Sequence, residues 1–532
     1  MKRVVAVICL VIAGIGVSGQ ATVIYVDDDA VGMNDGSSWT DAFAYLQDAL
    51  ATVQPGDEIR VAQGIYRPDE NMAFPEGTGI LIASFKLLDG VAIMGGFAGV
   101  GAPDPDARDI TCFETILSGD LAEDDVPVAD PCDLLTEPTR SDNSFAIVTA
   151  RSCSRSAILD GFTIAAGHAG GRAGSGAGLL FGGSDELCSP SVRNCSFIGH
   201  SGSAVCASGL SYPEFVGCTF AHNACWSRGG AINIYTYTSS NTEPSDCDIV
   251  IERCTFIGNY SAKTGGAVYV HDSSYYNPIA SVVTVDECVF MANTAQIGGA
   301  VYVDDTLLFK VANCHFVCSR AAETAGAIYF WRTQVDMRSC TLVDNVAPCA
   351  RACYAGYDTF LSVRNTILWD GGDEIGIDQD AFVDIAYSNV QNGWPGEGNV
   401  DADPLFANLG YWDPNNTPDD PYDDYWVEGD YHLQSQGGRW DPNSATWVID
   451  DVTSPCIDAG DPNSPIGLEP FPNGGYINIG AYGGTAEASK SYFGEPLCET
   501  IMTGDINGDC RVDSVDLAIL LSHWQEEPIR DR

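Results

Sequence analysis

The chain has 532 residues, with 73 acidic against 25 basic side chains and a formal net charge of −48. A hydrophobic fraction of 45% is typical of a folded chain, so the acidity does not indicate disorder. So negative a surface repels phosphate backbones and anionic membranes, which excludes nucleic acid as a partner and leaves divalent cations, cationic partners, neutral polysaccharides, or acidic polysaccharides bridged by a metal.

Residues 1–21 have the pattern of a secretory signal peptide. Lys2 and Arg3 form a basic tip, residues 4–17 are an apolar run, and small residues follow. The run is shorter than the about 18 to 20 residues that span a bilayer, so cleavage is favoured over a membrane anchor. We therefore predict a secreted or cell-surface protein with no transmembrane segment in the mature chain. An exported chain can form disulfides, although its cysteine count after cleavage is odd.

Residues 22–66 predict a strand, a short helix and two further strands. Ser38 is a suitable N-cap, and the apolar residues that follow it recur at helical spacing. These apolar residues are Trp39, Phe43, Leu46, Leu50 and Val53. The segment resembles the opening of extracellular β-helix proteins, pectate-lyase-like ones included. We expect the helix to cap the first coil and to block edge-to-edge aggregation.

One motif recurs seven times along the middle of the chain. In each copy an apolar residue stands two positions after a Cys or Asn, and the copies follow one another at steps of 23, 36, 34, 26, 26 and 25 residues. In most copies a Gly-Ala-Ile or Gly-Ala-Val segment comes later in the repeat. The first residues of the copies are Cys195, Cys218, Cys254, Cys288, Cys314, Cys340 and Asn365.

A period of this length without helical spacing predicts an all-β solenoid, a right-handed parallel β-helix with one coil per copy. Stacked strands lie about 4.8 Å apart, so equivalent residues form columns along the axis. We expect a buried thiol column, an aromatic column beside it, and an asparagine column of Asn223, Asn259 and Asn293 at left-handed turns. A column of buried cysteines acting as small hydrophobes is favoured over a metal or redox site.

The two half-motifs, FxxN followed by GGA[IV], are similar to the repeat of the polymorphic outer-membrane-protein family of surface β-helix adhesins. This resemblance covers about 195–345. Further on, segments within 401–482 resemble the choice-of-anchor region of exported bacterial proteins, and 411–450 is rich in Asp, Pro, Asn and Trp, which predicts long loops. The predicted order is a signal peptide at 1–21, an N-terminal cap and first coils at 22–150, the repeat core at 151–395, a loop-rich closure at 396–490 and a small calcium module at 491–532.

Residues 505–516 carry oxygen side chains at loop positions 1, 3, 5, 9 and 12, the spacing of an EF-hand-like calcium loop. Ca²⁺ takes six to eight oxygen ligands on a loop of this length, and position 7 contributes its backbone carbonyl. The predicted ligands are Asp505, Asn507, Asp509, Arg511 through its carbonyl, Asp513 and Asp516. The alternative is a solvated acidic tail, which the apolar helical stripe after the loop argues against.

This loop with a helix after it resembles a type I dockerin repeat, a calcium module that docks polysaccharide-degrading enzymes onto cohesins. The resemblance implies Ca²⁺ as a cofactor and a cohesin-like protein as a possible partner. Dockerins carry two copies of the repeat, whereas one clear copy is present here, so surface attachment or stabilisation is the other role to consider for the module.

The repeat register also predicts a ligand-binding face. The residue after the inward Val or Ile of each Gly-Ala strand points outward, and so does the residue two positions further on. The predicted face contains Tyr269, Tyr302 and Tyr329 in one row and His271, Asp304 and Trp331 in the next. Aromatic rings at these steps could stack on sugar rings, or the tyrosines could only stabilise the sheet through cross-strand pairing.

Catalytic residues cannot be assigned from the sequence. The polygalacturonase set of motifs is not present as a set, and neither a paired-carboxylate motif nor a lyase-like arginine cluster is evident. Two hypotheses follow. The chain binds or processes extracellular polysaccharide as a lyase or glycoside hydrolase, or it is a non-catalytic surface adhesin or scaffold. A group of converging carboxylates or an Arg–carboxylate cluster on the structure would favour the first.

Overall fold

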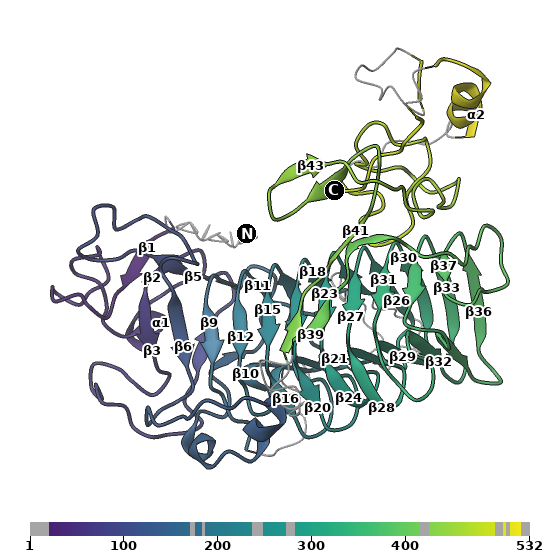
Figure 1. The fold of residues 1–532 in the computed structure, drawn as a ribbon. Helices are drawn as coiled ribbons and strands as arrows, with labels where there is room; N and C mark the ends of the chain where they lie inside the picture. Colours follow the sequence, from purple (N-terminus) through teal and green to yellow (C-terminus); the bar gives the residue numbers. More distant parts are fainter. Residues whose placement is uncertain are drawn as a thin grey trace, which may run out of the picture.

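The computed structural model describes residues 21–170, 176–182, 187–236, 248–272, 282–413, 425–494, 504–506 and 511–522. The chain winds into one long solenoid from β1 to β37, and a second region packs along its side and includes helix α2 (Ser514–Ser522) (Figure 1). The predicted signal peptide lies outside the described residues, apart from its last position. The solenoid runs without a break through residue 150, where the sequence suggested that the repeat core begins.

Three long parallel sheets and one short one form the walls of the solenoid. The twelve-stranded sheet contains β1 (Val23–Val26), β2 (Glu58–Ala62), β5 (Ala92–Phe97), β8 (Ile158–Asp160), β11 (Ser191–Arg193), β14 (Glu214–Val216), β18 (Ile249–Glu252), β22 (Val282–Asp286), β26 (Leu308–Ala312), β30 (Gln334–Arg338), β33 (Phe360–Arg364) and β36 (Phe382–Ala386). The eleven-stranded sheet contains β3 (Gly64–Tyr66), β6 (Thr115–Ser118), β9 (Thr163–Ala165), β12 (Ser196–Ile198), β15 (Thr219–Ala221), β19 (Thr255–Ile257), β23 (Val289–Met291), β27 (His315–Val317), β31 (Thr341–Val343), β34 (Ile367–Trp369) and β37 (Asn389–Val390).

The ten-stranded sheet contains β4 (Phe85–Leu87), β7 (Val148–Ala150), β10 (Gly176–Phe181), β13 (Ser203–Gly209), β17 (Ile232–Thr236), β21 (Val268–Asp272), β25 (Val301–Asp304), β29 (Ile328–Trp331), β32 (Cys353–Ala355) and β35 (Ile375–Ile377). The short sheet contains β16 (Ala224–Cys225), β20 (Tyr260–Ser261), β24 (Thr294–Ile297) and β28 (Arg320–Thr324). Each strand in these sheets pairs with the equivalent strand of the next coil, which is the arrangement that the repeat period predicts.

The predicted thiol and aromatic columns fill the interior. The six column cysteines are buried, and the backbone N–H groups of Cys218, Cys254 and Cys288 each donate to the Sγ of the next column cysteine at 3.4 Å. The rings from Phe197 to Phe316 are stacked with centroids 4.5–4.9 Å apart. The cysteines therefore act as packing residues of the core.

The asparagine column forms at left-handed turns, although the asparagines themselves are not the left-handed residues. The left-handed residue is the one before each of them, with φ of 54° at His222, 57° at Gly258 and 54° at Ala292. That residue turns the chain and directs the following side chain into the interior, where Asn223 and Asn259 are fully buried. The turn and the ladder are thus made by neighbouring positions.

The N-terminal helix is shorter than the pattern predicts. Helix α1 spans Leu46–Leu50, and Ser38 does not cap it. Phe43 is extended instead, because its N–H donates to the Tyr25 carbonyl at 2.9 Å and it pairs with β1. Trp39 packs against Tyr25 with ring centroids 4.8 Å apart. The helix still buries its apolar side chains on the first coils. Two 3-10 helices, η1 (Pro131–Leu135) and η2 (Pro138–Asp142), lie in a later loop.

The C-terminal closure is not made of loops alone. It contains three antiparallel pairs, β38 (Phe406–Asn408) with β41 (Asp430–Leu433), β39 (Tyr411–Asp413) with β40 (Tyr425–Val427), and β42 (Arg439–Asp441) with β43 (Thr446–Val448). A satellite core that includes Val343, Ile367, Tyr431 and Ile479 joins the closure to the eleven-stranded sheet. The composition of 411–450 suggested loops because these strands are only three or four residues long.

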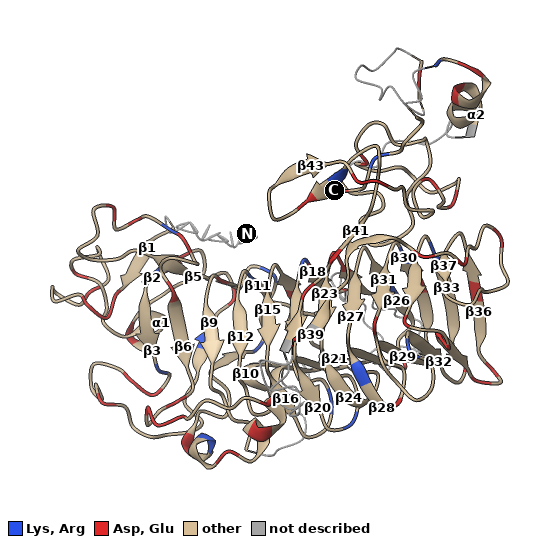
Figure 2. Ribbon diagram, in the orientation of Figure 1, with Lys and Arg blue, Asp and Glu red and all other residues tan. Residues whose placement is uncertain are grey.

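Most of the negative charge lies outside the strands. Figure 2 shows Asp and Glu mainly on turns and loops, whereas the strands are largely uncharged. The acidity is therefore a surface property of a neutral solenoid. No helix in the described part of the chain is long and apolar enough to cross a membrane.

Candidate functional site

The ten-stranded sheet presents two outward rows where the repeat register predicts them. In the inner row Asn233, Tyr269, Tyr302, Tyr329 and Tyr354 are register neighbours on successive coils. In the outer row, two residues further along each strand, the neighbours are Tyr235, His271, Asp304 and Trp331. We call these the inner row and the outer row.

The rings of the inner row stack on one another. Their centroids are 5.6 Å apart from Tyr269 to Tyr302, 4.8 Å from Tyr302 to Tyr329 and 5.2 Å from Tyr329 to Tyr354. Tyr269 is 2% exposed and Tyr329 9%, and burial raises the pKa of Tyr302 to about 12. The ring faces are occupied by neighbouring tyrosines, so the inner row serves cross-strand stacking and leaves little ring surface for a ligand.

The outer row is more accessible and contains both aromatic and charged groups. Tyr235 is 41% exposed and stacks on His271 with centroids 4.5 Å apart. His271 Nδ1 lies 3.1 Å from Asp304 Oδ2, and the Tyr269 hydroxyl donates to the same oxygen at 3.4 Å. At the other end of the row Trp331 contacts Tyr357, which is 46% exposed.

Two further charged residues complete this group. Arg332 donates from Nη2 to Asp305 Oδ2 at 2.6 Å, and that oxygen lies 3.8 Å from His271 Nδ1. Burial raises the pKa of Asp305, the Asp304 carboxylate raises it further, and Arg332 opposes both effects. The sequence patterns did not single out Asp305 or Arg332, because they follow the strands in left-handed positions with φ of 53° and 46°. The only sequence feature that pointed to this group was the pair of consecutive aspartates, Asp304 and Asp305.

We call His271, Asp304, Asp305 and Arg332 the polar cluster. The first three have ligand atoms within 4.8 Å of one another, so they are chemically able to hold a cation. Two other such groups occur in the described part of the chain, Asp27–Asp29 and Asp120 with Asp124 and Asp125, and both contain only carboxylates. The polar cluster is distinguished by its mixed chemistry and by the aromatic side chains on both sides of it.

The described part of the predicted calcium loop brings its two ends together. The Ile506 N–H donates to Asp516 Oδ1 at 2.6 Å, and the Asp513 N–H donates to Asp516 Oδ2 at 2.7 Å. Asp505 and Asp516, loop positions 1 and 12, are both buried. Helix α2 (Ser514–Ser522) begins within the loop, and Arg511 precedes it. Asn507 and Asp509 lie outside the described residues.

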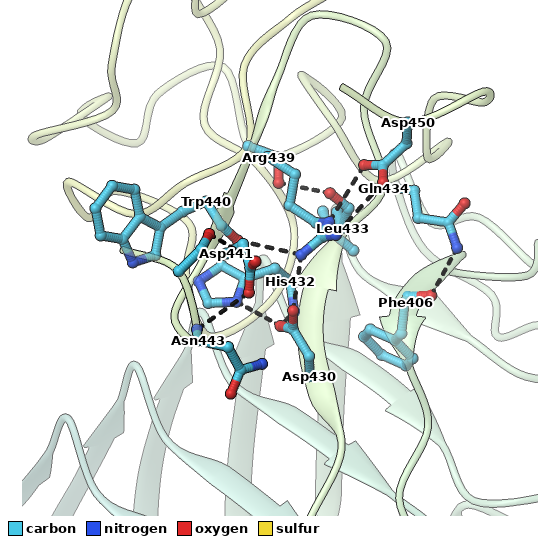
Figure 3. A network of polar contacts seen from close by, with 12 residues as sticks. Phe406, Asp430, His432, Leu433, Gln434, Arg439, Trp440, Asp441, Asn443 and Asp450 are labelled. Atoms are coloured by element: carbon cyan, nitrogen blue, oxygen red, sulfur yellow. Dashed lines mark hydrogen bonds and ion pairs between the residues drawn. The ribbon is translucent and has the colours of Figure 1, made fainter. Parts of the chain in front are cut away.

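A third polar group lies in the closure, where no catalytic or binding residue was predicted (Figure 3). Asp430 Oδ1 lies 2.6 Å from His432 Nδ1, and its Oδ2 accepts from Arg439 Nη1 at 2.7 Å. Arg439 also donates from Nε to Asp450 Oδ2 at 3.2 Å. This network ties β41 to β42 and to the segment just after β43, so it stabilises the closure.

Comparison with known proteins supports the architecture. Residues 141–367 match the family model described as "Right handed beta helix region", and residues 386–460 match one described as "Disaggregatase related". The fold and the first match define the chain as a right-handed parallel β-helix protein. No curated protein matches it.

Two solved structures are similar at low identity. A pectate lyase structure has 11% identity and a TM-score of 0.43, over 87% of this chain and 97% of that chain. A rhamnogalacturonan lyase has 12% identity and a TM-score of 0.37, over 78% of this chain and 97% of that chain.

Proposed function

We propose that this protein binds an extracellular polysaccharide along the outer row of the ten-stranded sheet. The observation that supports this proposal is the arrangement of aromatic side chains around the polar cluster, with the exposed Tyr235 at one end and the half-buried Trp331 with the exposed Tyr357 at the other. Aromatic side chains provide an apolar surface with a polar edge, and the carboxylates, imidazole and guanidinium between them provide hydrogen-bond partners for sugar hydroxyls.

The polar cluster favours binding or processing of a polysaccharide over a purely structural role. Arg332 and Asp305 form an ion pair beside Asp304. Such an Arg–carboxylate cluster is the feature that would favour a polysaccharide-binding or polysaccharide-processing protein over a non-catalytic adhesin. A lyase or glycoside hydrolase would use such groups to neutralise charge or transfer protons. A depolymerisation screen of the parent and of Asp304→Asn, with and without Ca²⁺, decides between processing and adhesion. Products from the parent alone indicate an enzyme, and their absence from both indicates an adhesin or scaffold.

The binding proposal is tested by substitution of the exposed ring. Tyr235→Ala should weaken binding to whichever polysaccharide of a soluble panel the parent retains in affinity electrophoresis. Phe382→Ala is the matched control, because Phe382 is an aromatic residue 58% exposed on the twelve-stranded sheet, away from the outer row. Retention of the parent by no polysaccharide, or equal retention of the parent and Tyr235→Ala, would refute the proposal.

We further propose that residues 505–516 bind Ca²⁺ and that the protein acts outside the cell. The buried carboxylates at loop positions 1 and 12 support a cation between the loop ends. The chain's own residues would supply oxygen ligands there, and the ion would hold the loop against helix α2. Docking onto a cohesin-like protein stays a prediction from the dockerin resemblance, and pull-down with a cohesin module in Ca²⁺ and in chelator tests it.

A further inference from the structure

A second candidate ligand site lies between the solenoid and the closure. A cleft of about 690 Å³ opens there. Its floor is made by Val289 and His315 of the eleven-stranded sheet and by the turns that join this sheet to the twelve-stranded one, and its roof by closure residues within 464–487. This volume is within the range of about 300–1,000 Å³ that is typical of small-molecule sites. The cleft involves neither the outer row nor the calcium loop.

Two residues of the floor, Val289 and His315, belong to a regular row of side chains that continues out of the cleft. Ser196, Thr219, Thr255, Val289 and His315 are register neighbours at outward positions on β12, β15, β19, β23 and β27. The first four are half-buried, and the closure reaches the sheet at β23, where Val289 lines the cleft. Because coils repeat about every 4.8 Å, the row offers an evenly spaced path of mainly hydroxyl side chains that leads into the cleft.

The roof is fixed by the solenoid, so the cleft is preformed. The Ala481 N–H donates to Thr341 Oγ1 at 3.0 Å. Asn313 Nδ2 donates to the carbonyls of Ala481 and Gly483 at 2.9 and 3.0 Å. These bonds hold a short segment of the closure above the sheet, and a preformed site spares a ligand the entropic cost of ordering it.

The inner end of the cleft is rigid and aromatic. The His315 ring packs on Tyr482 with centroids 4.8 Å apart, and Tyr482 stacks on His432 at 3.6 Å. His432 is held in turn by Asp430 in the network of Figure 3. Burial lowers the pKa of His315 to about 3, so its imidazole is neutral at ordinary pH.

Charge is confined to the mouth of the cleft. Glu287, Arg338 and Glu487 line it and are exposed, with both signs represented. Uncharged groups make up the rest of the lining, with Ser339 and Thr485 as hydroxyl examples and Pro465 as an apolar one. This lining suits a neutral ligand rich in hydroxyl groups, and the net charge of −48 disfavours an anionic one.

We infer that this cleft binds the end of a linear, neutral oligosaccharide whose chain runs along the row from Ser196 to Val289. The evenly spaced side chains of the row suit a ligand built from a regular repeat. The aromatic residues at the inner end of the cleft would contact the terminal sugar ring of that ligand. This site is separate from the one in the proposed function, and either can exist without the other.

The test is calorimetric titration of the full chain with neutral cello-, xylo-, manno- and malto-hexasaccharides, and with an oligogalacturonide as the anionic comparison. Ala486→Trp fills the cleft from an exposed lining position that makes none of the roof bonds described above. Binding of at least one neutral hexasaccharide to the parent should weaken at least tenfold in Ala486→Trp. Tyr235→Ala should leave the binding of this hexasaccharide to the cleft unchanged. If the cleft and the outer row bind the same hexasaccharide, the parent should bind two molecules per chain and each variant should bind one.

Three results would overturn the inference. They are no binding of any neutral hexasaccharide, binding of the oligogalacturonide alone, and an Ala486→Trp variant with the affinity and stoichiometry of the parent. Thermal unfolding of Ala486→Trp at the parental temperature confirms that a loss of binding is not a loss of fold. Loss of binding in Tyr235→Ala only would support the outer-row site and reject the cleft.

Discussion

Asn259 donates a side-chain hydrogen bond to Oδ1 of Asn293, 3.0 Å away on the next coil, and the backbone N–H of Asn259 donates to the same oxygen at 3.0 Å. Asn223 makes the same pair of bonds to Asn259, and each Nδ2 also donates to the carbonyl of a phenylalanine in the aromatic column. Each asparagine thus satisfies buried backbone groups on its own coil and on its neighbours, where water has no access.

Substitution Asn259→Ala should lower the free energy of unfolding by about 2–4 kcal/mol. It leaves the Asn223 N–H and the Phe220 carbonyl without their partner in the core, and each such buried group costs about 1–3 kcal/mol. Chemical denaturation followed by circular dichroism measures the effect. Asn463→Ala, at an exposed position of the closure, is the control and should change stability by less than about 0.5 kcal/mol. Equal stabilities for the two variants would contradict the structural role of the ladder.

The repeat made much of the fold predictable. Equivalent residues recur once per coil, so the period alone placed Cys288, Phe290 and Asn293 in three columns, and it placed both outward rows of the ten-stranded sheet. The period could not predict how deeply the side chains of those rows are buried. Outward direction is a property of one strand, whereas the burial of Tyr269 depends on rings from the next coil and on Arg228, whose guanidinium lies 4.8 Å from the ring centroid.

Contacts between distant segments were beyond the reach of sequence patterns. His432 meets Tyr482, and Asn313 meets Gly483, through packing of the closure on the solenoid, and no local spacing encodes it. The same holds for the polar cluster, where Arg332 reaches Asp305 on the preceding coil. The N-terminal helix begins later than predicted for a related reason, because strand pairing with β1 overrides the helical spacing of Phe43.

The column thiols are buried, so they should react slowly in the folded protein, and Cys195 is the clearest case. Burial raises the pKa of Cys195 to about 12, so almost no reactive thiolate forms at neutral pH. Cys112 and Cys349 are exposed and should be alkylated first. Mass spectrometry of peptides after brief iodoacetamide treatment measures the order of labelling, with the guanidinium-unfolded chain as the control in which all sites react. Labelling of Cys195 in the native protein as fast as Cys349 would show that the column is open to solvent.

The contribution of His200 to stability should be lost as pH drops below about 6.5. This side chain occupies the ladder position in the first copy of the repeat, where Nδ1 accepts from the Gly167 N–H and Nε2 bonds the Ile164 carbonyl, both at 3.0 Å. Burial lowers its pKa from 6.5 to about 3. Between these values the unfolded chain binds a proton that the folded chain does not, so acidification favours unfolding by up to about 1.4 kcal/mol per pH unit.

Replacement His200→Asn should reduce this pH dependence, because it removes the titrating group and keeps an amide at the ladder position. Denaturant titrations of parent and variant between pH 7.5 and 4 give the two slopes, and the variant's slope should be smaller by up to one proton's contribution. His315, whose pKa is lowered in the same way, supplies a residual slope in both proteins. Parallel curves for the two proteins would mean that His200 is not a buried neutral residue.

Calcium binding should depend on Asp516. Its carboxylate closes the loop by accepting from the N–H groups of Ile506 and Asp513, and position 12 is where an EF-hand-like loop supplies its strongest carboxylate ligand. We expect Asp516→Ala to weaken Ca²⁺ binding at least tenfold, about 1.4 kcal/mol, in calorimetric titration of the chelator-treated chain. Asp380→Ala, at an exposed site on the solenoid, should bind Ca²⁺ like the parent. If Asp516→Ala retains the parent's affinity, the ion binds elsewhere, and the carboxylates of Asp27–Asp29 become the next candidates.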